Sequence, residues 1–277
     1  MGLTTEDDHP YIKIFDVGRQ IVTNRLDGFL PSRIVFFLNN LHIIPRPIYL
    51  TRHGQSEYNV DERLGGDPPL TEKGHMFTVK LREFMEQQPF DAETQLIVWS
   101  STMLRAVQTA EGITCAQHVR WKSMEEIDVR QTLGEASLSL WLSLSRSLVF
   151  VMQYVLLGRV RDGRLQVGVC DGMTYEEFER QLPEEFAARA KDKLRYRYPR
   201  GESYEDLIRR LDPIIIELER QRNPLLIVAH QAVLRCLYAY FADFDREQVP
   251  HLQVPSHTVI CLKPQAYGTS TEHFVLL

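Results

Sequence analysis

At 277 residues the chain is long enough for one large α/β domain with a buried core or for two small domains, and we expect one domain with appendages. Its 32 Lys and Arg against 37 Asp and Glu residues give a formal net charge of -5, which gives no bulk reason to bind nucleic acid or an anionic membrane, so any anion site must be local. Four widely spaced cysteines without zinc-ligand spacing indicate reduced structural thiols, and the acidic, polar N-terminal sequence, unlike a secretory signal, predicts a cytoplasmic location.

The first strong element in the chain is a short apolar run, PIYLTR, at residues 47–52. Its composition and the polar loop after it predict a buried strand with His53 at its C-terminal end. A Gly/Pro-rich loop follows at residues 65–69. Thr71 then begins a segment with spaced apolar residues to Phe84, which predicts a capped helix.

The later elements repeat this alternation of strand and helix. Residues 96–101 (LIVWSS) predict a second buried strand and residues 103–113 a helix. Apolar residues recur at helical period across 204–220, a third buried strand follows at 224–230, and 232–241 suits another helix. This order predicts an α/β fold with three layers, a mainly parallel central sheet with helices on both faces.

Several chemically active residues fall at predicted strand ends. Ligands of such sheets bind outside the C-terminal ends of the strands, where His53, the Ser100-Ser101 turn and His230 all lie. A neutral imidazole can attack a phosphoryl group and hold it as phosphohistidine. The transferred group needs prepositioned guanidinium groups, for which Arg52 and Arg105 are the candidates, and Gly54 allows backbone amides to approach it.

The leaving alkoxide needs a proton from a nearby carboxyl group. Glu126 and Asp128 follow a strand-like segment, HVRWKSM, and are the candidates. A lone histidine at a strand end is usually a structural residue, and the Arg-His-Gly triplet alone is a weak signal. The joint order of these groups along the chain favours a histidine-nucleophile phosphatase.

Long segments of the chain closely resemble the bisphosphatase half of 6-phosphofructo-2-kinase/fructose-2,6-bisphosphatase, in the phosphoglycerate mutase-like histidine phosphatase superfamily. These segments are LTRHGQSEYN (50–59), LGGDPPLTEKG (64–74), YPRGESYEDLIRRL (198–211), VAHQAVLRCLYAYF (228–241) and PSHTVICLKPQAYG (255–268). The resemblance covers about residues 10–128 and 167–270. It implies hydrolysis of the 2-phosphate of fructose 2,6-bisphosphate through phosphohistidine, with fructose 6-phosphate and phosphate as products. It implies no metal or organic cofactor, and no candidate metal cluster is visible in the sequence.

The resemblance also implies residue roles. His53 is the implied nucleophile, Glu126 the proton donor, and Arg52, Arg105 and His230 surround the transferred phosphate. The implied substrate-binding residues are Asn59, Gly65, Tyr175, Arg189, Lys193, Tyr204, Gln231 and Arg235. Simpler readings exist for some of these: the tyrosines can pack, and the Arg189 and Lys193 pair, four residues apart, can form a solvated helix face.

Two departures from the family pattern affect the expected organisation. No GxxxxGK[ST] phosphate loop occurs, so we expect this chain not to make the bisphosphate by that route. We predict a kinase-domain remnant and linker at residues 1–45, whose apolar positions would make it floppy or sticky. The phosphatase domain is expected at 46–277, interrupted by an insertion at 129–166. A homodimer and pairing with a full-length bifunctional homologue are the expected protein partnerships.

Three readings of the insertion stay open. The first is a membrane segment, because residues 137–157 are rich in Leu, Val and Phe. Arg146 and several serines argue against this reading, and a single membrane span would separate the two parts of the domain. A regulatory loop or docking helix is the second reading. Our preferred hypothesis is a translated intron or gene-model error, because removal of 129–166 restores the family spacing in frame and its ends can be encoded by splice-like codons.

Three functions are compatible with these patterns. The first is a fructose-2,6-bisphosphatase whose activity depends on whether the insertion leaves Glu126 correctly placed. The second is a broader sugar-phosphate phosphatase or mutase. The third is an inactive sugar-phosphate-binding or regulatory protein.

Overall fold

The computed structural model describes residues 9–15, 20–40, 46–90, 95–127, 170–199, 201–265 and 268–277. Asp128, one of the two predicted acid candidates, lies outside these ranges, and so does the predicted insertion 129–166. Within the ranges given, no helix combines the length and apolar character needed to span a bilayer.

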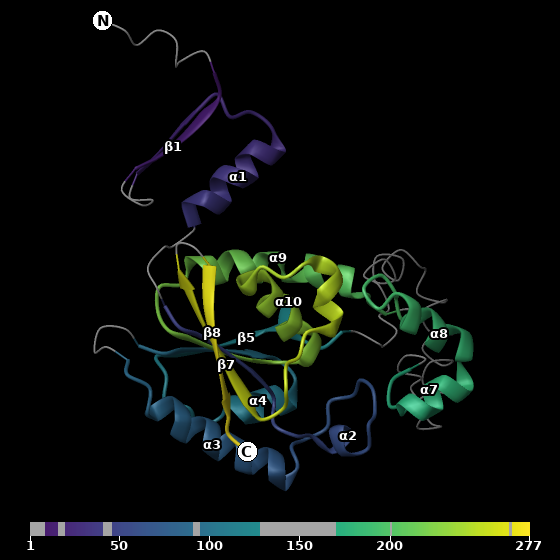
Figure 1. Cartoon of the computed structure of the whole chain (residues 1–277). Coiled ribbons are helices and arrows are strands. Elements are labelled where there is room, and N and C mark those ends of the chain that lie inside the picture. The colour runs from purple at the N-terminus through teal and green to yellow at the C-terminus, as the bar shows by residue number, and fades with distance from the viewer. Residues whose placement is uncertain are drawn as a thin grey trace, which may run out of the picture.

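A six-stranded sheet forms the centre of the protein, in the order β5-β4-β6-β3-β7-β8 (Figure 1). Its strands are β3 (Ile48–Arg52), β4 (Ile97–Ser101), β5 (Gln117–Trp121), β6 (Leu225–Ala229), β7 (Thr258–Gln265) and β8 (Gly268–Val275). Strands β5, β4, β6 and β3 are parallel, whereas β7 and β8 run antiparallel to their neighbours. The expectation of a mainly parallel sheet is therefore confirmed, with an antiparallel pair of strands at one edge.

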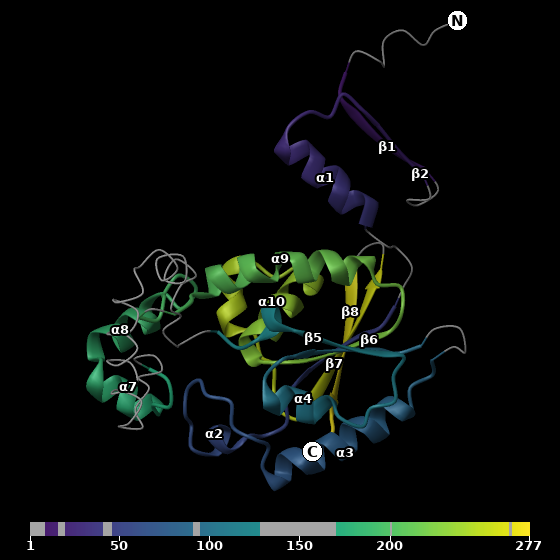
Figure 2. The ribbon, with the colours of Figure 1, turned by 180° about the vertical axis from the view of Figure 1, so that it is seen from behind.

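Helices cover both faces of this sheet, which explains its continuous apolar strands (Figures 1 and 2). On one face lie α3 (Glu72–Glu86) and α4 (Leu104–Ala110), and on the other α9 (Tyr204–Arg220) and α10 (Gln231–Ala242). Tyr49 packs in one apolar cluster with Phe77 of α3, while the next residue, Leu50, packs in the other with Leu211 of α9. The predicted three-layer arrangement is thus confirmed.

Local sequence signals set the helix ends. Thr71 accepts a hydrogen bond from Gly74 N at 3.2 Å and caps α3, as predicted. Ser203 forms a capping box with Asp206 at the start of α9. Helix α4 ends at Ala110, before the predicted end of the 103–113 helix, because Gly112 adopts a left-handed φ of 78°.

Shorter elements lie beside the sheet. These are α2 (Glu57–Val60), α7 (Tyr175–Gln181) and α8 (Pro183–Lys191), with two short 3₁₀ turns, η2 (Lys122–Met124) and η3 (Arg246–His251). Phe178 of α7 packs against Tyr198 in a small apolar cluster separate from the two main ones. Helices α7 and α8 therefore lie beside the three layers and outside their core (Figure 1).

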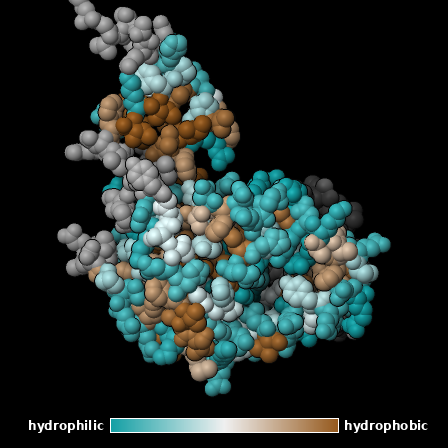
Figure 3. Space-filling model, viewed as in Figure 1, coloured by the Kyte–Doolittle hydropathy of each residue, from teal (hydrophilic) through white to brown (hydrophobic). Residues whose placement is uncertain are grey.

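The N-terminal unit is a hairpin of β1 (Tyr11–Phe15) and β2 (Gln20–Asn24) followed by α1 (Phe29–Asn40). It lies away from the main sheet in Figure 1, and Figure 3 shows a brown apolar area over it. Phe29 is 77% exposed and Leu30 67%, so this unit displays apolar surface as the sequence predicts. The domain division at residue 45 stays a prediction.

Candidate active site

His53 lies directly after β3 and is held as a neutral imidazole. Its side chain is buried, and its backbone N donates to Ala229 O at 3.0 Å, which ties it to the end of β6. Burial, followed by the nearby Arg105 guanidinium, lowers the pKa of His53 to about 3. Its Nδ1 lies 2.8 Å from Gly54 O, so Nδ1–H donates to that carbonyl and the lone pair is on Nε2. Such an imidazole is ready to act as a nucleophile.

His230 lies beside His53, with ring centroids 5.1 Å apart. It follows β6 and is completely buried, which lowers its pKa well below the ordinary value. Ser101 Oγ accepts from Met103 N and lies 2.8 Å from His230 Nε2. When this hydroxyl donates to Nε2, the ring proton is on Nδ1, which has no hydrogen-bond partner among the described residues. His230 can then donate Nδ1–H to a phosphoryl oxygen.

Arg105 connects the candidate nucleophile with the candidate acid. It lies in the first turn of α4, and its side chain is only 2% exposed. Its Nε donates to His53 Nε2 at 3.1 Å, its Nη1 donates to Gly66 O at 2.9 Å, and its Nη2 forms an ion pair with Glu126. This guanidinium therefore contacts both reacting groups and can transfer its donors to a phosphate.

Arg52 supplies a second, partly buried cation at the end of β3. Its Nε is buried without a partner in the described part of the chain, and its Nη1 donates weakly to Val254 O at 3.5 Å. Burial lowers the pKa of Arg52, and the nearby Glu126 carboxylate opposes this shift. The unpartnered Nε is a donor available to an anion.

The structure gives Gly54 a different role from the expected one. Gly54 N donates to Thr109 Oγ1 at 2.8 Å, so this amide is already used within the protein. A Cβ atom at Gly54 would lie 2.7 Å from Gly74 O at the start of α3. Glycine is needed there because the two backbones approach closely, and not because its own N–H binds the phosphate.

Glu126 follows η2 and points its carboxylate at Arg105. Its Oε2 lies 3.9 Å from His230 Nδ1, and its side chain is 40% exposed. Arg210 of α9 binds the main chain around Glu126, donating to Glu126 O at 3.4 Å and to Ser123 O at 3.2 Å. Glu202 in turn pairs with Arg210 at 2.8 Å. The main chain before the acid is therefore fixed by a side chain of the core helix.

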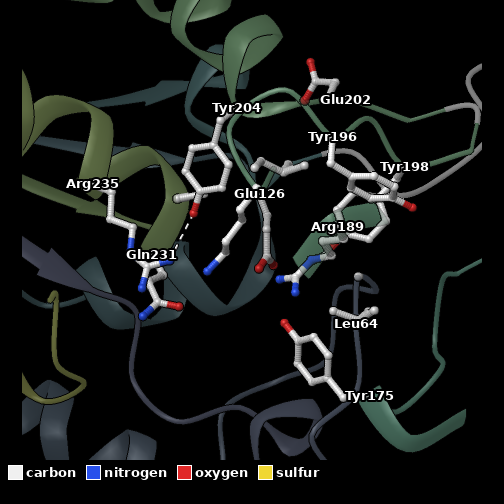
Figure 4. Close-up of a pocket in the computed structure, with 14 residues that line it drawn as sticks. Leu64, Glu126, Tyr175, Arg189, Tyr196, Tyr198, Glu202, Tyr204, Gln231 and Arg235 are labelled. Atoms are coloured by element: carbon white, nitrogen blue, oxygen red, sulfur yellow. Dashed lines mark hydrogen bonds between the residues drawn. The ribbon is translucent and has the colours of Figure 1, made fainter. Parts of the chain in front are cut away.

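A cavity of about 140 Å³ opens next to Glu126. Seven of the predicted substrate-binding residues line it: Gly65, Tyr175, Arg189, Lys193, Tyr204, Gln231 and Arg235. The eighth, Asn59, lies outside the lining and accepts from Ser56 N and Oγ at 3.0 Å each in the capping box of α2. Figure 4 shows the Tyr175 hydroxyl and the Arg189 guanidinium turned toward the Glu126 carboxylate.

Three cations make this cavity suited to an anion. Arg235 donates to Tyr204 Oη at 3.0 Å and to Leu252 O at 2.7 Å (Figure 4). Arg189 Nε donates to Tyr198 Oη at 2.8 Å. Burial first, then the charges of Arg235 and Arg189, lower the pKa of Lys193 to about 8. The mutual repulsion of these groups is relieved when an anion binds among them.

Sequence reasoning placed the Ser101 turn at the correct strand end without giving it a role, and it missed Thr109 and Arg210. All three contact the site through hydrogen bonds that follow from tertiary packing. Tyr198 and Arg210 lie in a segment that carries the family resemblance, so that signal was available. Over the described ranges, no group of three or more His, Cys, Asp or Glu residues is arranged to hold a metal ion.

Comparison with protein families gives two matches. Residues 48–146 and 164–276 match the family model described as histidine phosphatase superfamily (branch 1). Residues 2–45 match the model described as 6-phosphofructo-2-kinase. The boundary between the matches lies directly before β3.

Individual relatives carry both names. The chain is 43% identical over 266 residues to a Gallus gallus 6-phosphofructo-2-kinase/fructose-2,6-bisphosphatase, covering 96% of this chain and 47% of the relative. It is 42% identical over 275 residues to the Arabidopsis thaliana protein of that name, covering 98% of this chain and 32% of the relative. The chain thus spans a third to a half of the length of these relatives. Among solved structures, the alpha-ribazole phosphatase from Shigella flexneri superposes with a TM-score of 0.60 at 18% identity, covering 83% of this chain and 96% of that one, which supports the fold alone.

Proposed function

Because the chain belongs to branch 1 of the histidine phosphatase superfamily, we propose that it hydrolyses the 2-phosphate of fructose 2,6-bisphosphate. The products are fructose 6-phosphate and phosphate. One observation carries this proposal: the guanidinium of Arg105 contacts both His53 Nε2 and the Glu126 carboxylate. The candidate nucleophile His53 and the candidate acid Glu126 therefore both contact the same anion-binding side chain, Arg105.

The first half of the reaction transfers the phosphoryl group to His53. Its Nε2 lone pair attacks phosphorus as the bond from phosphorus to the sugar oxygen breaks. Arg105, Arg52 and His230 Nδ1–H stabilise the charge on the phosphoryl oxygens. Glu126, protonated when it acts, gives its proton to the departing sugar oxygen. Fructose 6-phosphate can then leave.

The second half restores the enzyme. The Glu126 carboxylate, having lost its proton, accepts one from water as the water oxygen attacks phosphorus. The bond between phosphorus and Nε2 breaks, and the electron pair returns to the His53 ring. Inorganic phosphate leaves with Glu126 protonated for the next cycle. No metal or cofactor enters this sequence of steps.

The cavity supports a substrate with a second phosphate. Arg189, Lys193 and Arg235 give it three positive groups apart from Arg52 and Arg105, which serve the transferred phosphate. Tyr175 and Tyr204 add hydroxyl donors for sugar oxygens. The relatives' printed name, fructose-2,6-bisphosphatase, supplies the sugar. A sugar monophosphate would leave one of the two cationic groups without an anion.

Phosphate release from fructose 2,6-bisphosphate by the purified chain, with acid-labile phosphate trapped on His53, tests the proposal. His53→Ala should abolish both signals while the circular dichroism spectrum stays that of wild type. An unchanged rate in this variant would reject His53 as the nucleophile. A version without residues 129–166, assayed beside it, measures what the insertion does to the rate.

Two other functions give different results in the same assay. A broader phosphatase or mutase would turn over other sugar phosphates in a panel at similar kcat/KM. A sugar-phosphate-binding protein would bind the bisphosphate and trap no phosphohistidine. We favour the specific phosphatase because acid, nucleophile and cations meet around one site.

The exposed apolar N-terminal unit supports a protein partner. Residues 2–45 are similar to 6-phosphofructo-2-kinase, and Phe29 and Leu30 are exposed. We propose that this unit pairs either with a second copy or with a full-length bifunctional homologue. Light scattering of the chain alone and mixed with such a homologue, against a Phe29→Ser, Leu30→Ser variant, separates the two. A monomer in both experiments would contradict the pairing.

A cytoplasmic location stays a prediction, which cell fractionation can test.

A further inference from the structure

The orientation of Arg105 depends on a carbonyl outside its own helix. Its Nε and Nη2 face His53 and Glu126, whereas its Nη1 donates to Gly66 O at 2.9 Å. A planar guanidinium with one fixed edge has its other donors fixed as well. The Gly66 carbonyl therefore helps to fix the directions in which Arg105 Nε and Nη2 donate.

The Gly66 peptide is held in an unusual conformation. Gly65 and Gly66 both adopt left-handed backbone angles, with φ of 71° and 59°. A Cβ atom at Gly66 would lie 2.4 Å from a ring carbon of Tyr58, so any other residue there would have to displace that ring. Two such glycines in sequence are flexible unless another group holds them.

Asp171 is the group that holds this peptide. Its Oδ1 accepts from Gly66 N at 2.7 Å, the length of a charge-assisted hydrogen bond. The backbone around Asp171 is itself tied to the same loop, because Gly172 N donates to Leu64 O and Leu64 N donates to Met173 O, both at 2.8 Å. The carboxylate therefore approaches Gly66 from a fixed position.

The neighbouring Asp67 does a different task. Both of its carboxylate oxygens accept from Leu104 N, at 2.8 and 3.0 Å, and its contact with Arg105 Nη1 is long at 3.5 Å. Asp67 thus orients the start of α4. The Gly66 N–H is bound by Asp171 and not by Asp67.

We propose that Asp171 is a positioning residue for phosphoryl transfer, which acts through Gly66 to aim Arg105 at His53 Nε2 and the phosphoryl group. This inference rests on the proposed function. Asp171 does not touch the substrate or the reacting atoms. Without its carboxylate the Gly66 carbonyl can turn, and Arg105 loses one of the contacts that fix its plane.

The expected effect is a loss in kcat with little change in KM. A displacement of about 1 Å at a catalytic group costs up to about a hundredfold in rate, so Asp171→Ala should lower kcat about tenfold to a hundredfold. The sugar cavity has its own cations, which keep KM close to wild type. Asp171→Asn keeps a side-chain oxygen for Gly66 N and should recover most of the rate. Asp61→Ala is the matched control, because Asp61 is an exposed carboxylate near the same loop whose side chain contacts only Arg63 in the described part of the chain.

A double-mutant cycle with Arg105→Lys separates positioning from general weakening of the fold. If Asp171 acts through Arg105, Asp171→Ala should cost much less in the Arg105→Lys background than in wild type. Orthovanadate affinity, a probe of the phosphoryl site, should fall in parallel with kcat. If Asp171→Ala does not fold, Asp171→Ser takes its place, because its hydroxyl is too short to reach Gly66 N.

Three results would overturn the inference: wild-type kcat in Asp171→Ala, no rescue by Asp171→Asn, or full additivity with Arg105→Lys. A wild-type rate in Asp171→Ala beside a dead His53→Ala would reject the positioning role and leave the proposed function standing. Failure of wild type to release phosphate from any sugar phosphate would reject the proposed function. In that case orthovanadate affinity in the same variants still decides whether Asp171 positions Arg105.

Discussion

Lys193 gives the sharpest pH prediction for sugar-phosphate binding. Its pKa is lowered from 10.5 to about 8 by burial and by the charges of Arg235 and Arg189. Bound phosphate would favour the charged ammonium, so the protonated form of Lys193 is the one that binds. The charged fraction in the free protein falls from about nine tenths at about pH 7 to about one tenth at about pH 9. The affinity for fructose 6-phosphate should therefore fall about tenfold over this range.

Isothermal titration calorimetry at constant ionic strength measures this change. Two variants remove the titrating group in opposite ways: Lys193→Arg keeps the positive charge at both pH values, and Lys193→Gln has none at either. Both should bind with little pH dependence, the arginine variant more tightly than the glutamine variant. A tenfold fall that persists in either variant would refute the assignment to Lys193 and move it to another group.

The remaining predictions concern the acid, a close backbone contact and the core. Glu126→Gln should slow departure of the sugar most, so that kcat falls more for poor leaving groups than for an activated aryl phosphate; an equal loss with both would move the acid role elsewhere. Gly54→Ala should destabilise the protein by about 1–3 kcal/mol in urea unfolding, because the new Cβ meets Gly74 O; a neutral result would show that the strand end can shift. Leu211→Ala, at a fully buried position, should cost about 2–5 kcal/mol in the same assay while KM stays unchanged.

The layered fold could be predicted because its signals are local. Strands β3, β4 and β6 are buried on both faces, so each is a continuous apolar run that stands out in the sequence. The Thr71 cap and the apolar period of α9 marked two helices for the same reason. The antiparallel direction of β7 and β8 has no such signal, because strand direction depends on the connections between strands.

The site could be predicted in its residues but not in its geometry. His53 and His230 were found because both follow buried strands, whose ends meet at one edge of the sheet. The contact of Arg105 with Glu126 depends on side-chain directions from two distant elements, which no local pattern encodes. Arg210 was missed because its role is to bind main-chain carbonyls, a task open to any arginine.

The two hydrogen-bonded anchors on either side of residues 128–169 have a mechanical consequence. On the side of Glu126, Arg210 holds the main-chain carbonyls, and on the other side Leu64 binds the backbone of Met173. On the second side Asp171 precedes this anchor in the chain, so a pull applied through the intervening segment would reach the carboxylate that binds Gly66 N before it reached the backbone bond of Met173. Because the cost of closing a loop grows slowly with its length, chain can be added between the anchors with little tension on the reacting groups. A fluorescent or ligand-binding module grafted there would therefore need a long linker on the Asp171 side, because tension on that carboxylate would reach Arg105 through Gly66.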